Sequence, residues 1–148
     1  MLTRKQADDI ADSVLDWGRA NDTGRLTAAV LDPGGHPIVV KRDEGSEFLR
    51  WDLAVGKAFG AIGMGLPTRV MAERVKHIPS LFVSLAATSS GKVVPLAGGV
   101  LIRQEGVIVG ALGVSGDTSE VDEDAAVAAI EAAGLQADFG QVEEWRRP

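Results

Sequence analysis

The chain has 148 residues, 45% of them hydrophobic and 24% charged, which is the size and composition of one globular domain. Its net charge of −6 argues against a nucleic-acid partner, because phosphate binding requires clustered Lys and Arg. The absence of cysteine excludes disulfides, thiolate catalysis and cysteine-held metals, and the absence of tyrosine excludes a phenolate ligand.

The chain starts with a predicted amphipathic helix over residues 4–20. Thr3 and Gln6 fit a capping box, and apolar residues follow at helical spacing. No apolar leader follows Met1, and no apolar run is long enough to cross a membrane. We therefore expect a cytoplasmic protein with no membrane partner.

Two short apolar runs, residues 26–32 and 37–42, predict a β-hairpin. Between them, Pro33 and Gly34 suit the two central positions of a type II turn. That turn requires a positive φ at Gly34, which glycine adopts without steric penalty.

A second helix is predicted over residues 46–65. Seven apolar side chains at helical spacing should form its buried face: Phe48, Trp51, Ala54, Val55, Ala58, Phe59 and Ile62. Gly56, Gly60 and Gly63 each lower helix stability by about 1 kcal/mol relative to alanine. They predict that another helix or another subunit approaches this backbone closely. The apolar excess of the helix, which a monomer would leave exposed, predicts a homo-oligomer.

The next segment predicts one short helix and two strands. Pro67 suits the first turn of a helix that ends near Lys76. Residues 78–92 predict one helical turn followed by a loop. Residues 100–103 and 107–114 predict two further strands.

A last helix is predicted to stop at Gly134. Its N-cap is either Asp117, paired with Glu120, or Ser119, paired with Asp122. Five carboxylates crowd this start: Asp117, Glu120, Asp122, Glu123 and Asp124. They lack the spacing of a calcium loop, so no metal site is predicted. We expect them to be solvated, where they complement the positive end of the helix and repel phosphate.

The order of these elements predicts an α/β domain over residues 1–135, with an antiparallel sheet of four or five strands flanked by helices. Residues 136–148 show no periodicity and are predicted to be a C-terminal extension. Trp145 in that segment would anchor it to the domain or to a neighbouring subunit.

Lys57 is the first candidate for a functional role, because it lies among small neighbours on a mostly apolar helix. Such an ammonium must reach solvent, face a carboxylate of the chain, or contact a ligand. A ligand role predicts that its counter-charge comes from outside the chain. Burial would lower the pKa of Lys57 and make it a candidate base.

Four more candidates lie at the ends of strands. Arg42 either pairs with Asp43 or forks onto a substrate carboxylate. The amides of Gly98 and Gly99 either form an anion-binding nest or simply begin a strand. Ser115 lacks the Gly-x-Ser-x-Gly surroundings of a nucleophile, so we expect it to hydrogen-bond a ligand.

Four segments carry a resemblance to a known family: Gly106 to Asp124, Leu31 to Ile38, Lys41 to Asp43, and Leu96 to Val100. The first is a β-branched strand that loses bulk towards Ser115 and then runs into the acid-rich helix start. Together they resemble the GlcG/HbpS family of small α/β proteins, also described as DUF336-like or haem-binding, over about residues 5–135. The resemblance implies a profilin-like three-layer arrangement and a small oligomer.

The resemblance also implies roles for particular residues. Lys57 matches the A-x-x-K-A helix of the family, and Gly98 and Gly99 match its G-G-x-P-I segment without the proline. Arg42 and Asp43 match its R-x-D region in a contracted form.

Three functional hypotheses follow. The first is a binding protein for a small organic acid or haem, with these residues at its pocket: Lys57, Arg42, Gly98, Gly99, Ser115 and His36. A haem iron would need His36, His77, Met64, Met71 or a weaker oxygen donor as axial ligand. The second is an enzyme of small-acid or aromatic-acid catabolism that uses Lys57 and Arg42. The third is an accessory subunit without a ligand.

Overall fold

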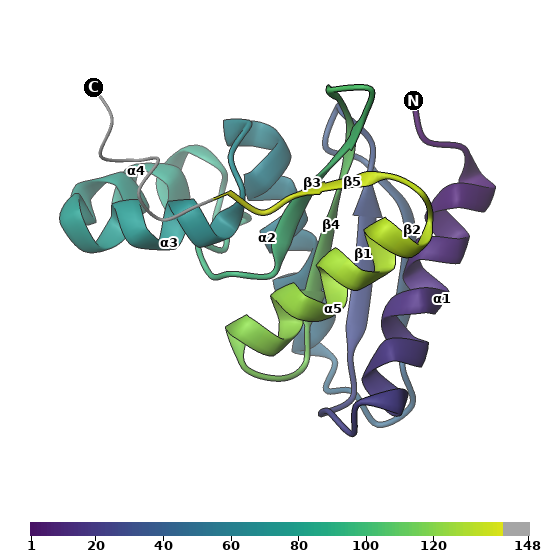
Figure 1. The fold of residues 1–148 in the computed structure, drawn as a ribbon. Coiled ribbons are helices and arrows are strands. Elements are labelled where there is room, and N and C mark those ends of the chain that lie inside the picture. The colour runs from purple at the N-terminus through teal and green to yellow at the C-terminus, as the bar shows by residue number, and fades with distance from the viewer. Residues whose placement is uncertain (141–148) are drawn as a thin grey trace.

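The computed structural model describes residues 1–140, and residues 141–148, including Trp145, lie outside the described part. Its elements are shown in Figure 1: α1 Arg4–Ala20, β1 Thr27–Leu31, β2 Pro37–Arg42, α2 Leu49–Met64, α3 Thr68–His77, α4 Pro79–Thr88, β3 Gly99–Gln104, β4 Val107–Ser115, α5 Ser119–Ala132 and β5 Gln136–Asp138. The five strands form one antiparallel sheet in the order β2-β1-β4-β3-β5. Within residues 1–140, none of the helices combines the length and apolarity that crossing a membrane requires.

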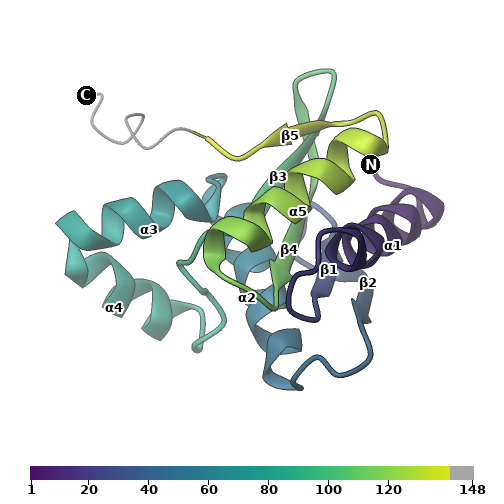
Figure 2. The same cartoon turned by 60° about the horizontal axis from the view of Figure 1, so that its bottom comes forward.

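Helices cover both faces of the sheet, and α3 and α4 stand to one side of it (Figure 1, Figure 2). Helices α1 and α5 pack on one face around aliphatic side chains such as Ile10, Leu112 and Ile130. Helix α2 packs on the opposite face through small residues, including Ala54 and Ala58. The structure therefore confirms the predicted α/β class, the antiparallel sheet and the three-layer arrangement.

The predicted capping box at the start of α1 is confirmed, whereas the start of α5 differs from the prediction. The N-cap of α5 is Thr118, whose Oγ1 accepts a hydrogen bond from Val121 N at 3.3 Å. Asp117 or Ser119 was predicted instead. Asp117 is occupied elsewhere, because its carboxylate accepts a hydrogen bond from Gly24 N at 2.7 Å.

The β1–β2 hairpin is confirmed, but its turn is not the predicted one. Positive φ occurs at Gly35 (83°) and not at Gly34. The side chain of Asp32 accepts hydrogen bonds from Gly34 N at 2.9 Å and His36 N at 3.0 Å. Its backbone oxygen accepts one from Gly35 N at 3.0 Å. The aspartate side chain thus sets the turn geometry.

Helix α2 presents its small residues, and not its large ones, to the sheet. Ala54 and Ala58 are fully buried, whereas Phe48 is 74% exposed and Trp51 is 46% exposed. The prediction that these two aromatic side chains are buried was therefore wrong. The reason is the close approach of β4, since a Cβ atom at Gly113 would clash with the backbone oxygen of Ala54.

The close approach predicted from the glycines of α2 occurs, but the neighbour is a loop segment of the same chain, residues 92–94. A Cβ atom at Gly56 would clash with the backbone of that segment, and one at Gly60 would lie 3.0 Å from Val93. A Cβ atom at Gly63 would meet no atom within 4 Å. These contacts give no support to a helix or subunit at this face.

Two elements exceed what the sequence predicted. Helix α4 has 10 residues, none of them buried, where one helical turn was predicted. Strand β5 pairs with β3, and Arg103 Nε donates a hydrogen bond to Asp138 at 2.8 Å. Residues 136–138 therefore belong to the sheet, although the predicted extension starts there. The last part of that extension, residues 141–148, lies outside the described residues.

Asp43 ties the C-terminal end of α1 to the end of the hairpin. Its carboxylate is 8% exposed and accepts two hydrogen bonds from Arg19, at 2.6 and 3.0 Å. These bonds hold the pKa of Asp43 below its ordinary value. Because the folded-state pKa is lower than the unfolded one, the pair stabilises the fold above the unfolded pKa. That stabilisation is lost as the pH falls through the folded-state pKa.

We expect Asp43→Asn to lower the free energy of unfolding by about 1–2 kcal/mol at pH 7. The loss should shrink as the pH falls below about 4, where wild-type Asp43 becomes protonated as well. Urea denaturation at several pH values measures both effects. Asp9→Asn is the control, since Asp9 forms an exposed pair with Lys5 and should change stability by less than about 0.5 kcal/mol. An equal loss from Asp43→Asn at every pH would contradict the prediction.

Candidate functional site

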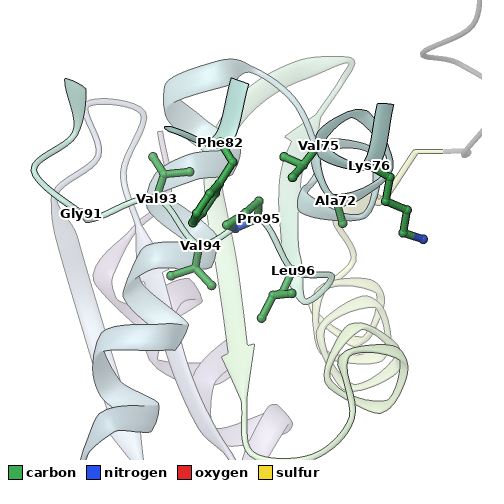
Figure 3. Close-up of a pocket in the computed structure, with 9 residues that line it drawn as sticks. All are labelled: Ala72, Val75, Lys76, Phe82, Gly91, Val93, Val94, Pro95 and Leu96. Carbon is green, nitrogen blue, oxygen red and sulfur yellow. The ribbon is translucent and has the colours of Figure 1, made fainter. Parts of the chain in front are cut away.

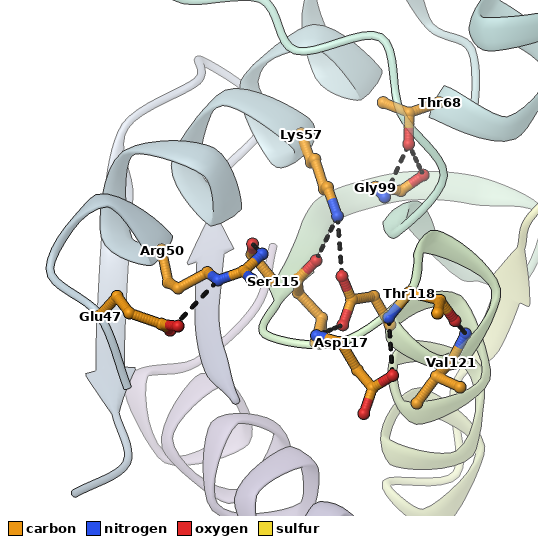
Figure 4. A network of polar contacts seen from close by, with 11 residues as sticks. Glu47, Arg50, Lys57, Thr68, Gly99, Ser115, Asp117, Thr118 and Val121 are labelled. Carbon is orange, nitrogen blue, oxygen red and sulfur yellow. Dashed lines mark hydrogen bonds and ion pairs between the residues drawn. The ribbon is translucent and has the colours of Figure 1, made fainter. Parts of the chain in front are cut away.

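Lys57 lies in a buried polar cluster between α2, β4 and α5 (Figure 4). Its Nζ donates hydrogen bonds to Asp122 Oδ2 at 3.0 Å and to Val114 O at 2.9 Å. The side chains of Lys57 and Asp122 are only 3% and 1% exposed. Of the possibilities considered for Lys57, the structure shows a carboxylate of the chain, supplied by α5, and it contradicts the outside counter-charge that a ligand role predicts.

Burial dominates the electrostatics of this ion pair. Desolvation lowers the pKa of Lys57 and raises the pKa of Asp122, while the attraction between the two groups opposes both shifts. The second carboxylate oxygen of Asp122 accepts a hydrogen bond from Asp117 N at 2.9 Å. The pair thus connects α2, β4 and the turn before α5. Its buried position makes it a structural cross-link and not an accessible base.

The acid-rich start of α5 is less exposed than predicted. Asp122 and Glu123 are 1% and 3% exposed. Glu123 accepts hydrogen bonds from the guanidinium of Arg69 in α3. The same guanidinium lies 5.4 Å from the centre of the Phe139 ring. Sequence reasoning missed these pairs because their partners lie 65 and 54 residues away in the chain. The sequence around an acidic residue does not distinguish a carboxylate that is exposed to solvent from one that is buried in an ion pair.

Gly98 and Gly99 make room for Lys57 and do not present a pair of free amides. The amide of Gly99 donates a hydrogen bond to Thr68 Oγ1 at 2.7 Å, so it is not available to an anion. Gly98 has a φ of 122°, and its oxygen accepts a hydrogen bond from Val114 N at 2.9 Å. A Cβ atom at Gly98 would lie 2.9 Å from Lys57 Nζ. These contacts match the interpretation as glycines that begin a strand.

Ser115 is fully buried at the end of β4. Its hydroxyl oxygen accepts a hydrogen bond from Arg50 Nη1 at 3.2 Å, and Arg50 Nε lies 3.4 Å from Glu47 Oε2 (Figure 4). Ser115 therefore joins the same buried region as Lys57 and positions Arg50 against the strand end. It does not line any hollow described below.

Arg42 and His36 lie apart from that cluster. Arg42 Nη1 donates a hydrogen bond to Ser46 O at 3.3 Å, while Asp43, its predicted alternative partner, is held by Arg19. His36 lies in the β1–β2 turn and its side chain is 80% exposed. The six predicted site residues therefore do not form a single pocket.

A hollow of about 580 Å³ lies between α3, α4 and residues 91–96 (Figure 3). Carbon atoms dominate its walls, which include Val75, Phe82, Val93, Pro95 and Leu96, and Lys76 is the charged residue among those that line it. Phe82 and Leu96 remain 41% and 47% exposed. In Figure 3, the ring of Phe82 lies beside Val93 and Pro95, and the amine of Lys76 extends away from them. The volume of the hollow lies within the range of small-molecule sites, about 300–1,000 Å³.

Sequence reasoning missed this hollow because it treated residues 78–92 as one turn and a loop. The apolar runs at residues 81–83 and 93–96 were a usable signal, since neither run belongs to a predicted core face. None of the lining residues is a histidine or methionine that could ligate haem iron. No group of three or more metal-ligating side chains occurs among residues 1–140.

Curated relatives with detectable sequence similarity are few and mostly longer than this chain. The corrinoid adenosyltransferase PduO of Citrobacter freundii is 32% identical over 111 residues, which are 75% of this chain and 33% of PduO. The match thus spans about a third of the relative. A 15.0 kDa protein of the same organism, from the dhaT-dhaS intergenic region, is 30% identical over 94 residues, which are 64% of this chain and 66% of that protein.

Solved structures with the same fold extend the comparison. A PduOC:haem complex superposes with a TM-score of 0.83 at 25% identity and covers 93% of this chain and 98% of that chain. A double mutant of Streptomyces reticuli HbpS superposes with a TM-score of 0.77 at 26% identity, with 88% and 86% coverage. The family model of HbpS-like haem degrading proteins matches residues 2–131. The chain therefore belongs to the HbpS-like family, as its sequence motifs predicted.

Proposed function

We propose that this protein binds a flat, largely apolar small molecule that carries a carboxylate, in the hollow between α3, α4 and residues 91–96. The observation that carries the proposal is the hollow itself, with apolar walls and a single lysine, Lys76, among its lining residues. Apolar walls gain from covering an apolar ligand. The exposed ammonium of Lys76 pairs with Glu73 Oε2 at 3.2 Å, and on binding it would turn from that partner to the acid of the ligand at the edge of the hollow.

Haem is the first candidate ligand, because the PduOC structure with the same fold is a haem complex. The hollow offers apolar surface for the porphyrin ring, but its lining residues include no histidine or methionine that could serve as an axial ligand of the iron. His36 lies in the β1–β2 turn, and Met71 is fully buried in the interior. His77 is close to Glu73, a residue of the same helix. We therefore expect the ring and its carboxylates, and not an iron ligand from these residues, to account for the affinity.

A small organic acid is the second candidate, on the same observation of an apolar hollow with one cation. The enzyme hypothesis has less support, because its proposed base, Lys57, is buried against Asp122. A homo-oligomer also remains a proposal, as does a cytoplasmic location. The homo-oligomer is supported by the exposed apolar side chains of α4, including Phe82 and Val83, which a second copy would cover.

The test is titration of the full chain with haemin and with iron-free protoporphyrin IX. We expect both to bind with similar Kd, followed by absorbance near the Soret band and by tryptophan quenching. Leu96→Asp places a charge in the apolar wall and should weaken both by at least about tenfold. Val107→Asp is the matched control, since Val107 is 63% exposed and does not line the hollow.

His36→Ala and His77→Ala should leave both affinities unchanged. Three results would contradict the proposal: equal binding by Leu96→Asp and wild type, loss of haemin binding in a histidine variant, or no binding of either porphyrin. In the last case, the same variants are screened with benzoate and longer-chain carboxylates by thermal shift. A shift that Leu96→Asp abolishes would identify an organic acid as the ligand of this hollow.

A further inference from the structure

A second hollow, of about 310 Å³, lies at the start of α2 and is separate from the site proposed above. It is lined by Arg42, Phe48 and Trp51. From these three residues we infer a binding site for a planar aromatic carboxylate, with the acid on Arg42 and the ring against the two aromatic side chains. This inference does not depend on the proposed porphyrin site, since the two hollows share no lining residue.

Arg42 brings a positive charge to this hollow. Its Nη1 donates to a backbone oxygen, that of Ser46, at 3.3 Å. Among residues 1–140, no ion pair involves Arg42, although Asp43 follows it directly. Asp43 is turned to Arg19 and Arg25 instead, at 2.6 and 3.8 Å. Within the described residues, Arg42 therefore has a backbone oxygen as its hydrogen-bond partner and no carboxylate.

The two aromatic rings of the hollow are exposed to solvent. Phe48 precedes the first turn of α2 and is 74% exposed, and Trp51 lies in that turn and is 46% exposed. Exposed apolar side chains that lie next to each other and are bordered by a polar group often mark a binding site. Both line the hollow that contains Arg42, so apolar surface occurs there together with a cation that has no acidic partner among residues 1–140.

One guanidinium and two aromatic rings together select the chemistry of the ligand. A guanidinium presents two parallel N–H donors that match the two oxygens of a carboxylate. Aromatic side chains contact a flat ring by stacking or edge-to-face packing. A carboxylate attached directly to an aromatic ring satisfies both requirements within one rigid molecule. A polyphosphate does not fit, because the site holds one cation and the chain carries a net charge of −6.

The experiment uses the ¹⁵N-labelled full chain, titrated with 2-naphthoate and with its neutral isostere 2-naphthamide. The three tryptophans, Trp17, Trp51 and Trp145, give separate indole N–H signals, and Trp51→Phe assigns one of them. We expect naphthoate, and not naphthamide, to shift the Trp51 signal in a saturable manner. The signal of Trp17, which lies in α1, should stay in place.

Variants at Arg42 separate charge from geometry. Arg42→Gln should weaken naphthoate binding by about tenfold. Arg42→Lys keeps the charge but loses the two parallel N–H donors of the guanidinium, so it should weaken binding by a smaller factor, about threefold. Arg4→Gln is the matched control, because it removes an exposed cation from α1 and should leave the affinity unchanged. Far-UV circular dichroism and Tm confirm that each variant is folded.

Several outcomes would overturn the inference. These are equal binding of naphthamide, unchanged affinity in Arg42→Gln, and the absence of any Trp51 shift. The inference is also overturned if light scattering shows a changed oligomeric state in Arg42→Gln or Trp51→Phe while naphthoate binding is retained. That result would make this face a subunit contact. Naphthoate binding lost in Leu96→Asp but retained in Arg42→Gln would place the acid in the first hollow. That result supports the proposed function while it rejects this second site.

Discussion

Replacing Lys57 by methionine is expected to lower the free energy of unfolding by about 3–5 kcal/mol at pH 7, because it leaves the buried carboxylate of Asp122 without its counter-charge. Methionine keeps the length and the apolar stem of lysine, so the loss reports mainly the missing charge and its hydrogen bond to Val114 O. Urea denaturation followed by far-UV circular dichroism measures it.

The pH dependence of this variant provides a second measurement. Burial raises the pKa of Asp122, and removal of the ammonium takes away the attraction that opposes the rise. When the folded-state pKa of a carboxyl exceeds its unfolded pKa, the free energy of unfolding of the protein falls as the pH rises towards the folded-state pKa. The deficit of Lys57→Met should therefore shrink as the pH is lowered from 7 to 4, relative to wild type.

Asp122→Asn in the Lys57→Met background is the control for this interpretation. The asparagine removes the unpaired charge and keeps an acceptor for Asp117 N, so we expect it to restore part of the loss, about 1–2 kcal/mol. Two results would contradict the prediction: a single variant within about 1 kcal/mol of wild type, or a double variant whose loss is the sum of the two single losses.

Gly113→Ala is the second change with a large expected effect. A Cβ atom at this position of β4 would clash with Ala54 O and lie 2.8 Å from Ala58 N, both in the backbone of α2. Backbone atoms cannot move aside as a flexible side chain can, so the helix must shift away from the sheet. We expect a loss of about 3 kcal/mol in the free energy of unfolding, at the upper end for overpacked cores.

Gly63→Ala tests whether that loss comes from the close contact or merely from the new methyl group. A Cβ atom at Gly63 meets nothing within 4 Å, and alanine favours the helix by up to about 1 kcal/mol. We therefore expect Gly63→Ala to raise stability in the same urea experiment. Similar changes in the two variants would show that the contact between α2 and β4 is looser than the structure indicates.

Most elements of this fold are predictable from the sequence because their signals are local. The capping box and the helical spacing that follow Thr3 specify α1 almost to the residue. The β-branched runs predicted as strands match β1 to β4 within about two residues. Local signals failed at Phe48 and Trp51, because which stripe of α2 is buried depends on how closely β4 approaches it.

The candidate sites were predictable only in part. The sequence marks Lys57 as unusual, because a lysine surrounded by small apolar residues cannot reach solvent easily. It does not identify the partner, since Asp122 lies 65 residues away among acids with the same local pattern. The hollow at α4 was missed because that helix has no buried face that would produce a periodic pattern.

The sequence by itself determined the family, the fold class and the position of almost every strand and helix, because turns, caps and hydrophobic periodicity act over a few residues. Only the tertiary structure decided which charges are paired and which are free. Ion pairs form between elements that folding brings together, so Lys57 became a buried cross-link, whereas Arg42 has no acidic partner within the described part of the chain.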